Sequence, residues 1–171
     1  VKTLMNLLGP LVNPAGAEYQ LIGVFSEEHC LPVAEAAKLL GLQRVLVVHS
    51  RDGMDEISVH APTRMVFADE NGKISDTLFR PAEAGIHGYT LRDLAGGSAE
   101  ENAETALQIM RGKGNEGLLQ AVSLNTGAAL YVYGLADSIR DGYAAAAGAF
   151  REGKVLAKYE EIRRVGGELG E

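Results

Sequence analysis

Residues 20–49 read QLIGVFSEEHCLPVAEAAKLLGLQRVLVVH and contain the clearest structural pattern in the chain. Residues 20–25 and 44–49 are short apolar runs with β-branched members, which is typical of buried strands. Between them, Ser26 is a candidate N-cap followed by acidic residues, and Gly41 is a candidate helix stop. Strand, helix and strand in this order predict a βαβ unit in a parallel sheet.

The chain changes character after this unit. Short strand candidates follow at residues 57–60, 63–68 and 74–79. Asn71-Gly72 lies between the last two and is a strong local signal for a β-hairpin. We expect this hairpin at the side of a mainly parallel sheet.

The remaining residues predict helices. Ser98 and Glu101 have the spacing of a capping box, which begins a helix that ends at Arg111. Further helices are expected at about residues 115–133, 138–151 and 154–165. The predicted fold class is therefore α/β, a mainly parallel sheet flanked by helices with a small β-hairpin excursion.

Length and composition exclude several classes of protein. A chain of 171 residues suggests one domain. Nucleic-acid binders usually show a basic face, and with a net charge of −7 nothing in the sequence argues for one, so no nucleic-acid partner is expected. The single Cys30 excludes an internal disulfide and fits a reducing compartment, for which we expect the cytoplasm.

The uncharged stretches at 3–17 and 117–136 are broken by Gly and Pro or rich in polar residues, so no membrane span is expected. Because the chain begins with Val1 and enters apolar sequence at once, we expect a fragment of a longer protein.

Residues 6–15, NLLGPLVNPA, carry two pairs of breakers, Gly9-Pro10 and Asn13-Pro14. One interpretation is a plain turn before the first strand. The other is a rigid loop whose backbone approaches a ligand, because Gly9 has no Cβ and Pro10 fixes the following chain.

A second candidate segment, residues 49–56, begins at the end of a predicted buried strand. Loops at the carboxyl ends of parallel strands are common ligand sites. Asp55 and Glu56 are adjacent carboxylates there, and Mg²⁺ prefers such oxygens together with substrate phosphates and water. The alternative is a solvated acidic turn. His49 is more simply explained as a strand-end histidine than as a catalyst.

A third segment, residues 118–134, has the apolar periodicity of a core helix. Asn125 lies beside the apolar stripe, where a buried amide needs hydrogen-bond partners. A satisfied core asparagine is the simpler interpretation. The sequence lacks zinc-type Cys/His spacing, a nucleophile elbow, a P-loop and GxGxxG, and no catalytic acid or base is assigned.

These segments together resemble the anthranilate phosphoribosyltransferase family. KTLMNLLGPLVNPA is similar to that family's RTxFNxLGPLxNPA stretch, and GMDEIS, LAGGSAEENAETALQIMRGKG and AVSLNTGAALYVYG are similar to its later segments. Lys2 and Met5 stand where the family usually has Arg and Phe.

The resemblance implies transfer of the phosphoribosyl group from phosphoribosyl pyrophosphate (PRPP) to anthranilate in tryptophan biosynthesis. It implies that Asp55 and Glu56 hold Mg²⁺ and that Gly9 borders the anthranilate channel. It also implies a homodimer for the full-length protein. By the same comparison, residues 1–171 are a partial α/β phosphoribosyltransferase domain, without the N-terminal helical domain, the GTGGD-type glycine-rich loop and an upstream arginine. We therefore expect the chain to be inactive alone.

Two alternatives remain open. A pyrimidine nucleoside phosphorylase shares the fold, and a KxSxK-like pattern upstream would favour it. A non-catalytic binding relative would be favoured by loss of the acidic pair or by a basic surface, whereas Asp55 and Glu56 are present and the net charge is −7.

Overall fold

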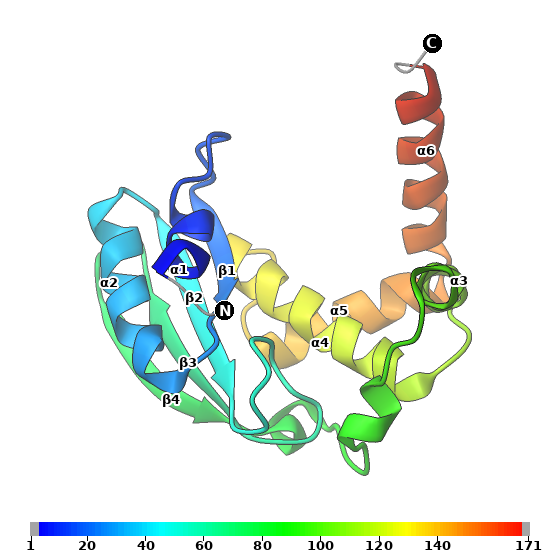
Figure 1. Cartoon of the computed structure of the whole chain (residues 1–171), viewed down its shortest axis with the longest axis horizontal. Coiled ribbons are helices and arrows are strands. Elements are labelled where there is room, and N and C mark those ends of the chain that lie inside the picture. Colours follow the sequence, from blue (N-terminus) through cyan, green and yellow to red (C-terminus); the bar gives the residue numbers. More distant parts are fainter. Residues whose placement is uncertain (1–3, 169–171) are drawn as a thin grey trace.

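The computed structural model of the chain describes residues 4–168, and the side chains of residues 7–167. In chain order the elements are α1 (Leu4–Leu11), β1 (Tyr19–Gly23), the 3₁₀ turn η1 (Glu27–His29), α2 (Cys30–Leu39), β2 (Arg44–Ser50), β3 (Thr63–Ala68), β4 (Ile74–Phe79), η2 (Pro81–Ala84), η3 (Leu91–Leu94), α3 (Ala99–Met110), α4 (Glu116–Tyr133), α5 (Ile139–Arg151) and α6 (Lys154–Glu168). Helices α1 and α2 cover one face of the sheet, α4 and α5 lie on the other, and α6 projects from the body (Figure 1).

The sheet is mixed and mostly antiparallel, with strand order β1-β2-β3-β4. β1 and β2 pair in parallel, whereas β2–β3 and β3–β4 are antiparallel. The α/β class is confirmed, but the prediction of a mainly parallel sheet is wrong. Residues 51–62 join β2 to β3 without a crossover helix, so β3 returns along β2 in the opposite direction.

The predicted hairpin at Asn71-Gly72 is confirmed as β3–β4. Gly72 has a φ of +79°, and the Asp69 carboxylate accepts hydrogen bonds from the backbone N–H groups of Asn71 and Lys73, both at 2.9 Å. The hairpin is not a side excursion, however, because it supplies half of the four-stranded sheet found within residues 4–168. The strand candidate at 57–60 is wrong, since these residues form part of a loop.

The predicted βαβ unit is confirmed, with local differences. Ser26 precedes η1 without a side-chain capping bond, and α2 begins only at Cys30, so that Pro32 falls in its first turn. Gly41 ends the helix as expected, with a φ of +94° and its N–H donating to Lys38 O at 3.0 Å.

The apolar core lies on both faces of β2. Val45 and Val47 pack with α2, whereas Leu46 and Val48 pack with α4. Because successive strand residues point to opposite faces, a strand covered on both sides is apolar throughout. This explains why residues 45–48, between Arg44 and His49, are all apolar.

Residues 4–11 form helix α1, which corrects the expectation of a turn or rigid loop over residues 6–15. Leucines recur at helical spacing, and Leu7 and Leu11 pack against the α2 side of the core. This burial outweighs the Gly9-Pro10 pair, which falls in the last turn, and the helix ends one residue after Pro10. The Asn13-Pro14 turn is present beyond it, with Asn13 Oδ1 accepting from Ala15 N–H at 3.0 Å.

The helical end of the chain follows the sequence signals. Ser98 and Glu101 form the expected capping box, and α4 ends at Gly134, whose φ is +89°. In the part of the chain that the structure describes, no helix combines the length and the apolar character that crossing a bilayer requires.

Candidate functional site

The loop of residues 51–62 joins the end of β2 to β3 and carries Asp55 and Glu56. It has no regular secondary structure, yet Ile57, Ser58 and Val59 within it are at most 2% exposed. A buried irregular segment needs specific partners for its backbone groups. These partners come from within the loop and from α4.

Asp52 and Ser58 brace the loop from inside. Ser58 Oγ donates to Asp52 Oδ2 at 2.6 Å and accepts from the N–H groups of His60 and Ala61 at 2.9 and 3.0 Å. Burial raises the pKa of Asp52, but hydrogen bonds from Ser58, Ser50 and the Met54 N–H outweigh it and hold that pKa below its ordinary value. Asp52 is therefore an ionised structural brace at neutral pH.

Asn125 on α4 connects the same loop to the helix by hydrogen bonds. Its Nδ2 donates to Ile57 O at 2.9 Å, and its Oδ1 accepts from Ile57 N–H at 2.9 Å. Nδ2 also donates to Ala121 O at 3.0 Å, within the helix. The interpretation of Asn125 as a satisfied asparagine on a core helix is confirmed, and the partner it satisfies directly follows the acidic pair.

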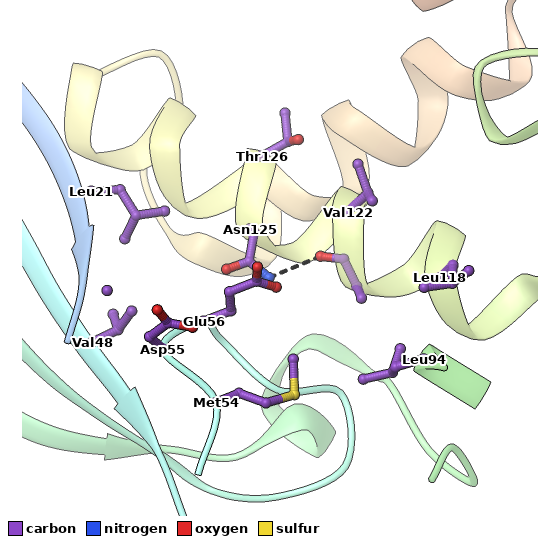
Figure 2. A pocket seen from close by; sticks show the side chains of 12 residues that line it. Leu21, Val48, Met54, Asp55, Glu56, Leu94, Leu118, Val122, Asn125 and Thr126 are labelled. Atoms are coloured by element: carbon purple, nitrogen blue, oxygen red, sulfur yellow. Dashed lines mark hydrogen bonds between the residues drawn. The ribbon is translucent and has the colours of Figure 1, made fainter. Parts of the chain in front are cut away.

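A cavity of about 600 Å³ lies between this loop, the end of β1 and α4. Figure 2 shows the Asp55 and Glu56 side chains together between the loop and α4. The walls are largely apolar and come from Leu21, Val48, Met54, Leu94, Leu118, Ala121 and Val122. Such a site combines two convergent carboxylates with an apolar enclosure, which is typical of small-molecule pockets.

Both carboxylates are exposed to the cavity, and within residues 7–167 neither accepts a hydrogen bond or forms an ion pair. In the same region no cluster of three or more His, Cys, Asp and Glu side chains could hold a metal ion alone. Two free carboxylates fit Mg²⁺, because this ion is commonly bound by one or two carboxylates with phosphate oxygens and water completing its shell.

Gly9 does not line this cavity. It lies in α1 and borders a separate cavity of about 580 Å³ with Pro10, Asn13 and β1. The two cavities share Leu21 and Gly23. A Cβ added to Gly9 would meet no atom within 4 Å, so the chain itself leaves space there.

His49 lies outside both cavities. Its Nδ1 is 2.8 Å from Val24 O, which makes it a strand-end histidine tied to the chain beyond β1. The interpretation that it is structural agrees with this contact.

Sequence reasoning missed Gly23 as a site residue. It ends β1, lines both cavities and lies directly against the backbone of Asp55. The only local signal was a glycine inside an apolar strand, which often marks a close backbone approach. The partner is 32 positions away, so the sequence did not identify it.

The model of the glycosyl transferase family, a/b domain, matches residues 1–156. Among curated proteins, the chain is 39% identical over 167 residues to anthranilate phosphoribosyltransferase of Shewanella baltica (strain OS185), covering 98% of this chain and 46% of that protein. It is 42% identical over 168 residues to the enzyme of the same name from Rubrobacter xylanophilus, covering 98% and 49%. The chain thus spans about half the length of the curated relatives it matches.

Solved structures of two enzymes with this name share the fold of the chain. The crystal structure of anthranilate phosphoribosyltransferase from Thermus thermophilus superimposes with a TM-score of 0.85 at 38% identity, over 94% of this chain and 47% of that one. The Saccharomyces cerevisiae enzyme in complex with PRPP and Mg gives a TM-score of 0.83 at 24% identity, over 94% and 46%. At the latter identity the likeness concerns the fold alone.

Proposed function

The chain belongs to the glycosyl transferase family, a/b domain, and from this premise we propose that it is the metal-holding part of an anthranilate phosphoribosyltransferase. The reaction is displacement of pyrophosphate from C1 of PRPP by the amine of anthranilate, a step of tryptophan biosynthesis. The observation that carries the proposal is the Asp55–Glu56 couple, which has no hydrogen-bond or ion-pair partner among residues 7–167 and is presented to an apolar cavity by a loop that is fixed on both sides.

Asp55 and Glu56 would hold Mg²⁺, an ion that is commonly bound by one or two carboxylates together with substrate phosphate oxygens and water. When bound, the ion neutralises charge that develops on the leaving group. The loop's contribution is positional: bonds from Asn125 and Ser58 hold its backbone, so both acidic residues stand beside the cavity before substrate arrives. Pre-positioned charge of this kind lowers the barrier to group transfer without a strong base. Accordingly, no side chain of this chain is assigned as general acid or base.

Gly9 borders the route of anthranilate. The support is the space around its Cα and the two residues, Leu21 and Gly23, that line both its cavity and the cavity of Asp55 and Glu56.

Residues 1–171 form a partial phosphoribosyltransferase domain in this proposal, consistent with their match to about half of each relative. The single buried Cys30 agrees with a cytoplasmic enzyme. The assembled full-length protein is a homodimer.

The test is a chimera in which this chain replaces the matching half of the Rubrobacter xylanophilus relative, which is 42% identical to it. We expect the chimera to convert anthranilate and PRPP to phosphoribosyl-anthranilate and pyrophosphate in a Mg²⁺-dependent reaction. Asp55→Ala with Glu56→Ala should lower kcat/KM for PRPP by about 10²-fold, or about 3 kcal/mol of transition-state stabilisation.

A folded chimera that consumes nucleoside and phosphate but not anthranilate would favour the phosphorylase alternative. Unchanged kinetics of the double variant at limiting Mg²⁺ would overturn the assigned role of the acidic pair. Circular dichroism and gel filtration of each chimera show that it is folded before kinetics are compared.

A further inference from the structure

Asn125 supplies Ile57 with both backbone hydrogen bonds that a neighbouring β-strand would otherwise provide. Its carboxamide accepts from the N–H and donates to the C=O of that one residue, both at 2.9 Å, across 68 positions of sequence. Ile57 is 0% exposed, so water cannot replace either bond. Loss of the amide would leave the N–H and C=O of Ile57 buried and unpaired. Because unpaired buried groups are unfavourable, we expect the loop to shift until they find new partners.

The helix that carries Asn125 is itself fixed. Ala121, Leu124 and Ala128, on the same side of α4, belong to the core that packs on β2. The carboxamide is therefore a rigid link from the packed core to a loop without regular structure. The two residues that immediately precede its partner are Glu56 and Asp55.

We propose that Asn125 is a positioning residue for the Asp55–Glu56 pair: its two bonds to Ile57 hold both carboxylates where one divalent cation and an anionic phosphate ligand can be bound together. The inference rests on the proposed function for the metal role of the pair. Asn125 uses its amide oxygen on Ile57 N–H and does not act as a ligand. Removal of a group that hydrogen-bonds directly to a metal ligand typically changes metal affinity by about 10–100-fold, and Asn125 acts on the residue next to the ligands, so we expect the lower end of this range.

The experiment uses the 171-residue chain and three variants. Asn125→Leu removes both bonds at similar volume, and Asn125→Gln keeps the carboxamide on a longer arm. Val132→Ala is the matched control, because Val132 is 2% exposed on the core side of the same helix, about two turns beyond Asn125, and takes no part in the hydrogen bonds to Ile57. It lowers stability without altering the link to Ile57.

Two measurements are made by NMR. Hydrogen exchange of the Ile57 amide reports the link itself. Mn²⁺, an oxygen-binding paramagnetic substitute for Mg²⁺, is then added stepwise to the protein in the presence of inorganic pyrophosphate. Broadening of the Asp55 and Glu56 amide signals gives the half-saturating Mn²⁺ concentration.

In Asn125→Leu we expect faster Ile57 exchange and a half-saturating Mn²⁺ concentration at least about tenfold higher. Asn125→Gln should recover part of both, and Val132→Ala should leave the Mn²⁺ value within about twofold. Faster Ile57 exchange with unchanged Mn²⁺ binding would overturn the positioning role and leave the proposed function intact. Absence of local broadening in the unsubstituted chain, with Ile57 protected, would instead overturn the metal role, and the positioning role with it.

Discussion

The Cα of Gly23 lies against the backbone carbonyl of Asp55, so closely that a Cβ built on Gly23 would stand 1.6 Å from that oxygen. A Cβ essentially never lies within 3.0 Å of a heavy atom outside its own chain neighbours, and the obstacle here is backbone rather than a flexible side chain. The last residue of β1 thus sets how near the acidic loop can approach the parallel strand pair. A glycine is required here for close approach, and not for an unusual φ.

Gly23→Ala should therefore displace the acidic loop. Because a misplacement of about 1 Å at a reacting site costs up to about 10²-fold, we expect a loss of that order in kcat/KM of the chimera. Gly166→Ala, on α6, is the control, since an added Cβ there meets no atom within 4 Å. Full activity in a folded Gly23→Ala chimera would mean that the loop adapts and that its approach to β1 is not needed.

The crossing of α4 and α5 offers a stability prediction independent of function. A Cβ on Gly142 would lie 2.2 Å from Gly127 O, so Gly142→Ala forces the two helices apart. We expect a loss of about 1–3 kcal/mol in the free energy of unfolding. Gly148→Ala on the same helix meets open space and should instead gain about 0.5–1 kcal/mol. Denaturant unfolding of both variants measures the contrast, and equal effects would contradict the packing at this crossing.

Cys30 should be unreactive in the folded chain. It is 0% exposed, and burial raises the pKa of its thiol to about 11, with nearby Arg64 opposing and Glu27 reinforcing the shift. At about pH 8 only about one thiol in a thousand is then ionised. Labelling with a thiol reagent should be slow in native buffer and fast in concentrated guanidinium chloride. Similar rates in both conditions would show that Cys30 is accessible.

The Arg64–Asp76 pair across β3 and β4 makes stability depend on pH. Arg64 Nε and Nη2 donate to the two Asp76 oxygens at 3.1 and 2.7 Å, and these bonds hold the pKa of Asp76 below its ordinary value. A carboxyl whose pKa is lower in the folded protein than in the unfolded chain stabilises the folded protein. This stabilisation is fully present above the unfolded-state pKa of about 4 and is lost as the pH falls through the folded-state pKa.

The difference in free energy of unfolding between the unsubstituted chain and Asp76→Asn, measured by denaturant unfolding, should therefore shrink as the pH falls from about 5 to about 2. We expect less than about 1 kcal/mol, because the Asp76 side chain is 44% exposed. In an Arg64→Gln background the same substitution should show little of this pH dependence. An advantage that grows as pH falls would contradict the assignment.

The chain by itself should form no product. PRPP must be held at both ends for displacement, and the advantage of a preassembled site is lost when one part is missing. Residues 1–171 supply the acidic pair but contain no GTGGD-type loop. The assay compares the purified chain with PRPP, Mg²⁺ and anthranilate, alone and mixed with the separately expressed N-terminal half of the Rubrobacter xylanophilus relative. Product from the chain alone, at a rate near that of intact enzymes, would show that the site is built from other residues.

Local chemistry was sufficient to predict much of this protein. The apolar run at 44–49, the Asn71-Gly72 hairpin, the Ser98 capping box and the Gly134 helix end all appear where their residues indicate. The hairpin turn, the capping box and the helix end are set by interactions within a few residues, and such interactions can be read from adjacent sequence. The strand pairs with distant segments, but its unbroken apolar run already indicates burial on both faces. Asp55 and Glu56 were predicted in the same way, as neighbours after a strand end; both line a cavity, and their metal role stays a prediction.

Contacts between distant residues decided the rest. The direction of β3 depends on how residues 51–62 fold back over the core, and helix α1 forms because Leu7 and Leu11 find apolar partners on α2. Asn125 and Gly23 act on the acidic loop from 68 and 32 positions away. Hydrogen-bond partners and steric limits exist only once the chain is packed, so a pattern within one segment predicted an amide in need of partners but not that Ile57 would be its partner.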